Sequence, residues 1–253
     1  PQRANGNRGG IVSLLTFLFS GYAVWRVAGE KRELFGGMFV HDPMTVFFTM
    51  LFCSVGLLAT LMSWDYVKRT KINQAEYYAL LLSSVLGMVV MAASNDLITV
   101  FLGLELMSLA LYVMVGFRRS QLESNEAALK YFLIGAFASG FLLYGIALIY
   151  GTAGTTELAA IGQKARDGNT LLSQPLFFIG VMLVLASFAF KVAAVPFHMW
   201  APDTYEGAPT PVTGFMMSAV KTAGFAGLIR LLMVALKSDA MTFGPTGWVP
   251  LMS

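Results

Sequence analysis

Charged residues are scarce in this sequence. Asp, Glu, Lys and Arg make up 12% of the 253 residues, which is about half of their share in an ordinary globular protein. The 17 basic and 14 acidic residues leave a formal net charge of +3, and they are scattered along the chain without a basic run. Binding to nucleic acid requires a concentrated basic surface. The sequence therefore excludes this class of function, and we expect no nucleic-acid partner.

Cysteine and histidine are nearly absent. Cys53 is the only cysteine, which excludes a disulfide framework, a zinc knuckle and a cysteine-ligated iron–sulfur cluster within the chain. The two histidines, His41 and His198, are too few for a haem or copper centre of any complexity. We therefore expect no cofactor and no metal ion in this chain, and no catalytic site of the kind found in soluble enzymes.

Apolar residues, in contrast, are abundant. They make up 57% of the chain, and the mean hydropathy is +0.68. A water-soluble protein of this size cannot hide so much apolar surface, because the share of surface that it buries is limited. The chain is therefore expected to lie in a lipid bilayer, where a helix needs roughly 20 apolar residues to cross the hydrocarbon core. Seven runs are candidate spans: 11–25, 44–63, 75–93, 97–117, 127–150, 176–196 and 212–236.

The pattern within these runs favours helices. Only helices and closed barrels satisfy the backbone inside lipid, and the runs lack the strict alternation of barrel strands. The sequence therefore predicts an all-α, polytopic transmembrane helix bundle with about seven spans. We expect a polar loop over 1–10, two transmembrane helices with their loops over 11–74, and a short amphipathic helix at the membrane interface over Thr155–Arg166. Residues 238–253 are expected to form a loop that leads to further helices outside this sequence.

Four ionisable side chains fall inside the predicted spans: Glu105, Lys130, Lys191 and Lys221. Each costs roughly 2.5–3.5 kcal/mol at mid-bilayer, so we do not expect them to face lipid. A Glu–Lys pair at about 4 Å is coupled by about 4 kcal/mol when the effective dielectric constant is near 20. A lysine in such a pair can gain or lose its proton as its partner moves, which makes these residues candidates for proton translocation. The alternative is that each lysine joins helices or extends to the membrane surface, most of all Lys130, which is only one turn inside its span.

A proline interrupts the sixth predicted span. Pro196 has no backbone N–H and its ring clashes with the carbonyl four residues earlier, which belongs to Val192, next to Lys191. Broken helices at membrane depth occur beside cavities and transported ions, but a span that simply ends at Pro196 explains the pattern equally well. His198 follows closely, and histidine is the residue type used for proton transfer at physiological pH. It is a candidate proton relay, with a hydrogen-bonded structural role as the alternative.

Five motifs and Lys221 occur together between the fourth and seventh spans. They are Gly103-Leu-Glu-Leu-Met-Ser-Leu109, Leu129-Lys-Tyr-Phe-Leu133, Leu143-Tyr-Gly-Ile-Ala-Leu148, Val195-Pro-Phe-His-Met-Trp-Ala-Pro-Asp203 and Tyr205-Glu-Gly-Ala-Pro-Thr-Pro-Val-Thr213. These motifs resemble subunit N of bacterial NADH–quinone oxidoreductase (respiratory complex I), one of its antiporter-like membrane subunits. The resemblance covers about residues 40–237, and its most specific part runs from Pro196 to Thr213.

The resemblance implies a longer subunit with two inverted five-helix repeats, of which residues 75–237 would be the first, proton-translocating one. It favours a discontinuous helix near Lys191–Pro196, pairs Glu105 with Lys191, and makes Lys221 the next proton carrier. Lys130 matches a lysine typical of subunit N. The resemblance also implies a multi-pass protein of the inner (plasma) membrane. Its partners would be the lipid bilayer and the other membrane subunits of complex I, which uses quinone elsewhere and not in this subunit.

Three other functions remain open at this point. A subunit of a sodium/proton antiporter has the same helix framework, and its transport would respond to sodium independently of NADH. A membrane-bound hydrogenase complex would be distinguished by its genomic neighbours. A purely structural membrane subunit would retain transport when Lys221 is made neutral.

Overall fold

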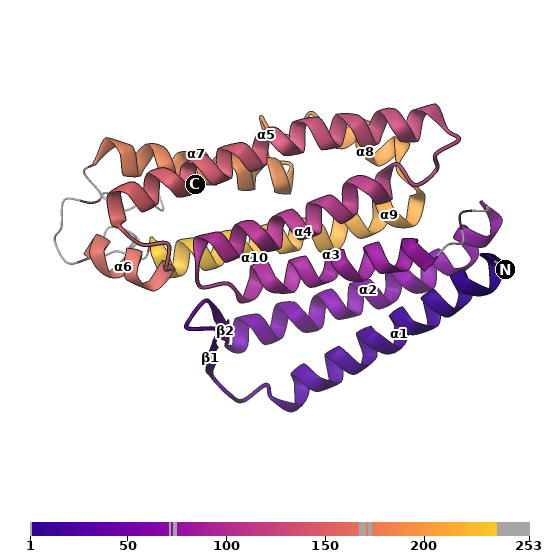
Figure 1. Cartoon of the computed structure of the whole chain (residues 1–253), viewed down its shortest axis with the longest axis horizontal. Coiled ribbons are helices and arrows are strands. Elements are labelled where there is room, and N and C mark those ends of the chain that lie inside the picture. Colours follow the sequence, from indigo (N-terminus) through magenta and orange to yellow (C-terminus); the bar gives the residue numbers. More distant parts are fainter. Residues whose placement is uncertain (1, 71, 73–74, 167–170, 172–173, 237–253) are drawn as a thin grey trace.

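The computed structural model describes the chain except for residues 1, 71, 73–74, 167–170, 172–173 and 237–253, so the loop expected over 238–253 lies outside the described residues. The described residues form a bundle of long helices that lie side by side (Figure 1). The elements are α1 (Gln2–Arg26), β1 (Arg32–Leu34), β2 (Phe39–His41), α2 (Pro43–Arg69), α3 (Ala75–Ala93), α4 (Leu97–Val115), α5 (Leu122–Ala153), α6 (Leu158–Arg166), α7 (Pro175–Val192), α8 (Ala201–Gly207), α9 (Thr210–Phe215), η2 (Met216–Val220), α10 (Lys221–Arg230) and η3 (Leu231–Ala235), where η marks a π-helical turn.

The first helices are stacked in the order of the chain. α1 lies against α2, α2 against α3, and α3 against α4 (Figure 1). α4 also contacts α5, which runs along the side of the bundle far from α1 and packs against both α7 and α8. The stretch from α9 to η3 returns through the bundle, where α10 contacts α3 and α7. The helices that carry Lys191 and Lys221 are therefore neighbours.

Six helical stretches of the described chain are long and apolar enough to cross a membrane. They are α2, α3, α4, α5, α7 and the stretch Thr210–Ala235, which runs from α9 to η3. The predicted polytopic helix bundle is confirmed, with six such spans where the sequence predicts seven. The remaining predicted span, 11–25, lies in α1, which packs against α2 and α3. α1 is not among the six stretches of the described chain that are long and apolar enough.

The start of α1 differs from the expectation. The sequence predicts a polar loop over 1–10, but the helix begins at Gln2, so this prediction is wrong for residues 2–10. A Cβ atom on Gly9 would lie 3.2 Å from the backbone of Ala75, and one on Gly10 would lie 2.6 Å from the Trp64 ring. The small glycines let α1 pack closely onto its neighbours, and this packing overrides the low helix propensity of the segment.

A short hairpin joins α1 to α2. β1 and β2 are antiparallel, with Arg32 opposite His41 and Leu34 opposite Phe39. The turn between them contains Gly36 and Gly37, both with positive φ, a backbone region that glycine adopts at little cost. The all-α prediction missed this hairpin because strands of three residues are too short to show an alternating pattern.

Polar groups and prolines fix the helix starts. The carboxylate of Asp42 accepts a hydrogen bond from the N–H of Thr45 at 2.8 Å, and Pro43 stands in the first turn of α2, where its missing N–H costs nothing. Asp96 caps α4 in the same way, through the N–H of Ile98 at 2.8 Å. The amphipathic helix predicted over 155–166 is present as α6 and contacts η3.

The predicted discontinuity follows Lys191 directly. α7 ends at Val192, and Ala193 turns out of the helix with φ of 58°. The chain then makes a turn, which includes Pro196, before α8 continues along α5. Trp200 stabilises the break, because its Nε1 donates a hydrogen bond of 3.0 Å to the carbonyl of Phe190, which also accepts one from the N–H of Ala193 at the end of α7.

Two pairs of glycines set the distances between spans. A Cβ on Gly87 of α3 would lie 2.7 Å from the carbonyl oxygen of Gly103 on α4, and a Cβ on Gly103 would lie 2.9 Å from that of Gly87. The same reciprocal contact, at 2.7 Å and 2.9 Å, joins Gly145 of α5 to Gly180 of α7. Small residues allow close backbone approach between membrane helices, so the positions of α4, α5 and α7 depend on these contacts.

Candidate functional site

Lys191 lies in the last turn of α7, directly before the break. Its side chain is buried, with 2% of the residue exposed. Nζ donates a hydrogen bond of 2.6 Å to the hydroxyl of Ser108 on α4. Nζ also lies 5.9 Å from the ring centre of Tyr112 and 5.7 Å from that of Tyr131, where the faces of the rings attract a cation. One hydroxyl and two aromatic rings therefore surround the ammonium group.

The enclosure of Lys191 depends on a second glycine of α5. A Cβ on Gly135 would overlap the hydroxyl of Tyr112. The ring of Tyr112 in turn contacts the ring of Tyr131, with their centres 4.8 Å apart. The absence of a side chain at Gly135 thus lets the tyrosine of α4 reach across to α5, beside the ammonium.

Glu105 lies one turn before Ser108 on α4 and is partly buried. Its Oε1 accepts a hydrogen bond from the hydroxyl of Ser139 on α5. Among the ion pairs of the described residues, none joins Glu105 to Lys191. The pairing that the resemblance implies is therefore not a direct contact here, because each of the two charges is satisfied by a hydroxyl of a neighbouring helix.

Lys221 is the first residue of α10 and is half-buried. Its Nζ lies 5.6 Å from the ring centre of Tyr205 on α8. One turn later, a Cβ on Gly224 would lie 2.8 Å from the side chain of Val192 and 3.8 Å from that of Lys191. The structure therefore brings α7 and α10 into close contact near the two lysines, as a path from one to the other requires.

Lys130 occupies a different place. Its Nζ lies 2.7 Å from Asp203 and 2.8 Å from Glu126, and 45% of its side chain is exposed. These three residues line a cavity of about 230 Å³ at the start of α5, next to α8. Exposed ion pairs of this kind contribute little to stability. The structure thus places the side chain of Lys130 with acidic groups in an exposed position, whereas the ring of the next residue, Tyr131, faces the ammonium of Lys191.

His198 lies in the turn between α7 and α8, and its side chain is exposed. Its carbonyl accepts a hydrogen bond of 3.0 Å from the N–H of Ala201, which begins α8. The position of this histidine after the break agrees with the sequence prediction. The structure does not bring its ring into the enclosure around Lys191.

Metal-binding groups do not gather in the described part of the chain. No three His, Cys, Asp or Glu side chains there lie close enough together to hold a metal ion. Cys53 is buried and has a free thiol. The expectation that this chain holds no cofactor stays a prediction.

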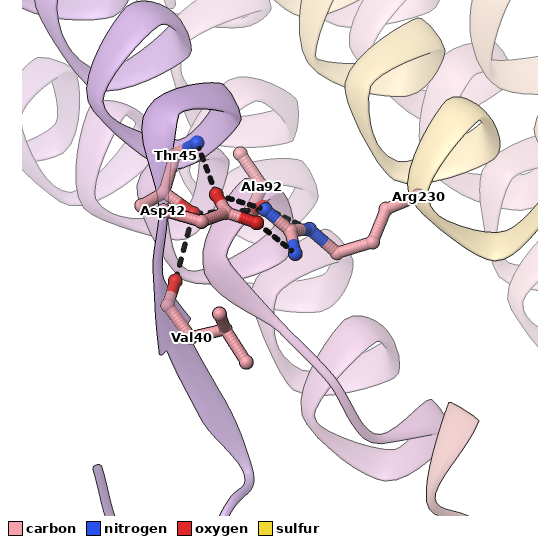
Figure 2. Close-up of polar contacts among 5 residues, drawn as sticks. All are labelled: Val40, Asp42, Thr45, Ala92 and Arg230. Atoms are coloured by element: carbon pink, nitrogen blue, oxygen red, sulfur yellow. Dashed lines mark hydrogen bonds and ion pairs between the residues drawn. The ribbon is translucent and has the colours of Figure 1, made fainter. Parts of the chain in front are cut away.

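A second buried charge was not among the residues predicted from the sequence. Arg230, in the last turn of α10, is 3% exposed, and Figure 2 shows its guanidinium group facing the carboxylate of Asp42. Two parallel hydrogen bonds, of 2.9 Å and 3.0 Å, join the two groups. The guanidinium also donates to the carbonyl of Ala92 at 2.7 Å and to the hydroxyl of Thr45 at 2.9 Å. One side chain therefore links α10 to the start of α2 and the end of α3.

The sequence contains a partial signal for this contact. Arg230 falls inside the last predicted span, where a charge is costly, and Asp42 precedes Pro43 in the pattern of a capped helix start. The two residues are far apart in the chain, however, and only the packing of α10 against α3 brings them together.

Asp42 lies just outside the span that begins at Pro43. Partial burial opposes its ionisation, but the hydrogen bonds from Arg230 and Thr45 outweigh this effect and hold the pKa of Asp42 below its ordinary value of 3.8. A carboxyl group with a lowered pKa stabilises the fold above its ordinary pKa. This stabilisation is lost as the pH falls through the pKa of the folded state.

We expect acid to destabilise the wild type more steeply than an Asp42→Asn variant, because asparagine does not titrate. The measurement is thermal unfolding in detergent between about pH 6 and about pH 3. Asp65→Asn is the control, because Asp65 is exposed and its replacement should leave the slope unchanged. Equal slopes for the wild type and Asp42→Asn would contradict the role of the Arg230–Asp42 pair in acid stability.

Comparison with known proteins supplies the family. Residues 94–245 match the transmembrane family described as NADH:quinone oxidoreductase/Mrp antiporter, and this stretch covers more than half of the chain. The chain belongs to this family. The matched range includes α4, α5, α7 and α10, and therefore Glu105, Lys191 and Lys221.

Relatives within the NADH:quinone oxidoreductase/Mrp antiporter family are similar over most of the chain. NADH-quinone oxidoreductase subunit N of Trichlorobacter lovleyi is 46% identical over 242 residues, which are 94% of this chain and 49% of that protein. Subunit N 1 of Sorangium cellulosum is 47% identical over 245 residues, 95% of this chain and 48% of that protein. These relatives confirm the predicted resemblance to subunit N. The chain spans about half the length of the curated relatives that it matches.

Solved structures of the family have the same fold. A chain of respiratory complex I from Thermus thermophilus, solved with bound aureothin, superposes with a TM-score of 0.76 at 33% identity, over 89% of this chain and 48% of that chain. A chain of the Mrp complex of Dietzia sp. superposes with a TM-score of 0.77 at 22% identity, over 98% of this chain and 47% of that chain. The second likeness concerns the fold alone.

Proposed function

We propose that this chain is the proton-translocating part of subunit N of an NADH–quinone oxidoreductase. In this proposal it spans the inner (plasma) membrane, surrounded by lipid and by the other membrane subunits of complex I. Protons pass along a buried series of Glu105, Lys191 and Lys221, and the passage is coupled to quinone reduction elsewhere in the complex. The chain itself holds no cofactor and binds no quinone.

The enclosed ammonium of Lys191 is the observation that carries this proposal. A buried lysine is costly unless its charge is compensated. Here a hydroxyl and two aromatic rings compensate it, and no carboxylate of the described residues forms an ion pair with it. A charge balanced so weakly is sensitive to any change in its surroundings. Lys191 is therefore suited to release a proton when the nearby charge of Glu105 moves or is neutralised.

The proposed sequence of events follows from the positions of these groups. Quinone reduction perturbs a neighbouring subunit, which alters the interaction between Glu105 and Lys191. The ammonium of Lys191 then passes a proton towards Lys221 on the adjoining helix. The close approach of α7 and α10 at Gly224 supports a transfer between these two helices.

Replacement of Lys191 by alanine in the complete complex tests the proposal. We expect proton translocation and quinone-linked turnover to fall by about tenfold or more, since a positioned proton-transfer group contributes about 10²–10⁴-fold to a rate. Glu105→Gln and Lys221→Ala should lower both rates in the same direction. The measurements are NADH oxidation and acidification of the interior of vesicles that contain the complex.

Lys31→Ala is the matched control, because it removes the same charge from an exposed loop between α1 and β1. Its rates should equal those of the wild type. Near-normal turnover and translocation by an assembled Lys191→Ala complex would refute the proposed function. Transport that depends on sodium and not on NADH would instead favour an antiporter subunit.

A further inference from the structure

Five hydroxyl groups are buried without a hydrogen-bond partner among the described residues. Those of Ser13 and Ser84 lie on α1 and α3, whereas the other three lie on the contacting helices α5 and α8. These three belong to Tyr131 on α5 and to Thr204 and Tyr205 on α8. Tyr131 and Thr204 are both 0% exposed. Native proteins rarely leave such groups unsatisfied, and a group without a protein partner is typically satisfied by buried water. Three of them close together indicate a hydrated region inside the bundle.

This region lies between the two lysines. The ring of Trp200 stacks on that of Tyr131, with centres 4.8 Å apart, and contacts that of Tyr205 at 5.7 Å. Lys191 faces the ring of Tyr131 at 5.7 Å, whereas Lys221 faces the ring of Tyr205 at 5.6 Å. The aromatic series Tyr131–Trp200–Tyr205 therefore extends from one ammonium group to the other.

Trp200 fixes this series but is not free to carry a proton. Its indole N–H is committed to the carbonyl of Phe190, and the residue is 2% exposed. The polar atoms that remain available are the hydroxyls of Tyr131 and Tyr205 in the series and that of Thr204, which precedes Tyr205 in α8. Each hydroxyl can donate and accept one proton at the same time, which a chain of proton transfers requires.

We propose that the hydroxyls of Tyr131, Thr204 and Tyr205, together with water, form the hydrogen-bonded path between Lys191 and Lys221. This inference rests on the proposed function. Lys191 gives a proton to the path and becomes a neutral amine, and Lys221 in its neutral form takes one up. Each hydroxyl accepts a proton on one side and releases its own on the other, so none changes its charge after the transfer.

The test uses variants that remove a hydroxyl and keep the packing. In the complete complex, Tyr131→Phe and Tyr205→Phe should each slow proton translocation by about threefold or more, and the double variant by about tenfold. Their solvent deuterium isotope effect should rise above that of the wild type, because proton transfer becomes rate-limiting. Thermal stability should not fall, since the lost hydroxyls have no hydrogen-bond partner in the described part of the chain.

Thr204 offers a second, independent test. Thr204→Val removes the hydroxyl at nearly constant shape and should slow translocation, whereas Thr204→Ser keeps the hydroxyl and should retain the wild-type rate. Tyr144→Phe is the control on α5, because Tyr144 is 60% exposed. If Thr204 had a purely structural role, Thr204→Val and Thr204→Ser variants of equal stability would have the same translocation rate and the same isotope effect.

The outcomes separate this inference from the proposed function. Normal rates and isotope effects in the Tyr131→Phe/Tyr205→Phe double variant and in Thr204→Val, with an inactive Lys191→Ala complex, would overturn the hydroxyl path and leave the proposed function standing. Normal translocation by Lys191→Ala would overturn both. Slow translocation in the hydroxyl variants, with a raised isotope effect and retained assembly, would support the path.

Discussion

Replacing Arg230 by alanine is expected to lower the free energy of unfolding by about 3 kcal/mol, the lower end of the usual cost of breaking a buried ion pair, because Asp42 is only partly buried. The guanidinium group makes four hydrogen bonds to Asp42, Thr45 and Ala92. Its loss leaves the carboxylate of Asp42 without its partner beside the start of α2. It also removes the link that ties α10, and with it Lys221, to α2 and α3.

The measurement is equilibrium unfolding in mild detergent, with Arg119→Ala as the control. Arg119 is exposed in the loop before α5, so its removal should change stability little. The double variant Asp42→Leu/Arg230→Met should be more stable than Arg230→Ala, because no unpaired buried charge remains. A stability equal to that of the wild type for Arg230→Ala would contradict the importance of this pair.

Gly145→Ala is expected to destabilise the protein by about 1–3 kcal/mol, the range for an overpacked core. The new Cβ would lie 2.7 Å from the backbone oxygen of Gly180, and a backbone atom cannot move aside as a side-chain end can. α5 and α7 would have to separate, which would also shift Lys191 relative to Tyr131. We expect proton translocation to fall together with stability.

Gly140→Ala on the same helix is the matched control. A Cβ at Gly140 meets nothing within 4 Å, so alanine should be neutral or stabilising by about 0.5–1 kcal/mol through its higher helix propensity. The comparison uses thermal unfolding and vesicle acidification for both variants. If Gly145→Ala were as stable as Gly140→Ala, the reciprocal glycine contact would not set the distance between α5 and α7.

The sequence predicted the spans well where apolar runs were long. The third span, Ala75–Ala93, agrees with the structure at both ends, and the fourth begins at Leu97 as predicted. Helix extensions into polar sequence were missed, because α5 begins at Leu122, before the predicted start at Ala127, and α1 begins at Gln2. Hydropathy predicts which residues lie in the hydrocarbon core of the membrane. A helix can extend beyond that core wherever its backbone hydrogen bonds and its packing are maintained.

The candidate site was predicted in part. Glu105, Lys191 and Lys221 stood out because a charge in an apolar run is costly wherever it faces, and the break near Pro196 was visible from the ring geometry of proline. Sequence spacing could not show which groups these charges contact. Lys191 is hydrogen-bonded to Ser108 and Glu105 to Ser139, and the two charged residues do not pair directly. The position of Lys130 one turn inside its span did indicate an exposed side chain, but only the structure shows that Glu126 and Asp203 are its partners.

Local chemistry was therefore enough to determine that this chain crosses a membrane as helices, where it carries buried charges, and where one helix is interrupted. Hydrophobicity and the backbone geometry of proline act within a few residues, so a linear sequence displays them. The tertiary structure alone decided the contact of Arg230 with Asp42, the glycine crossings and the series of aromatic rings from one lysine to the other. Each of these joins residues that are distant in the chain, and their meeting depends on how whole helices pack against one another.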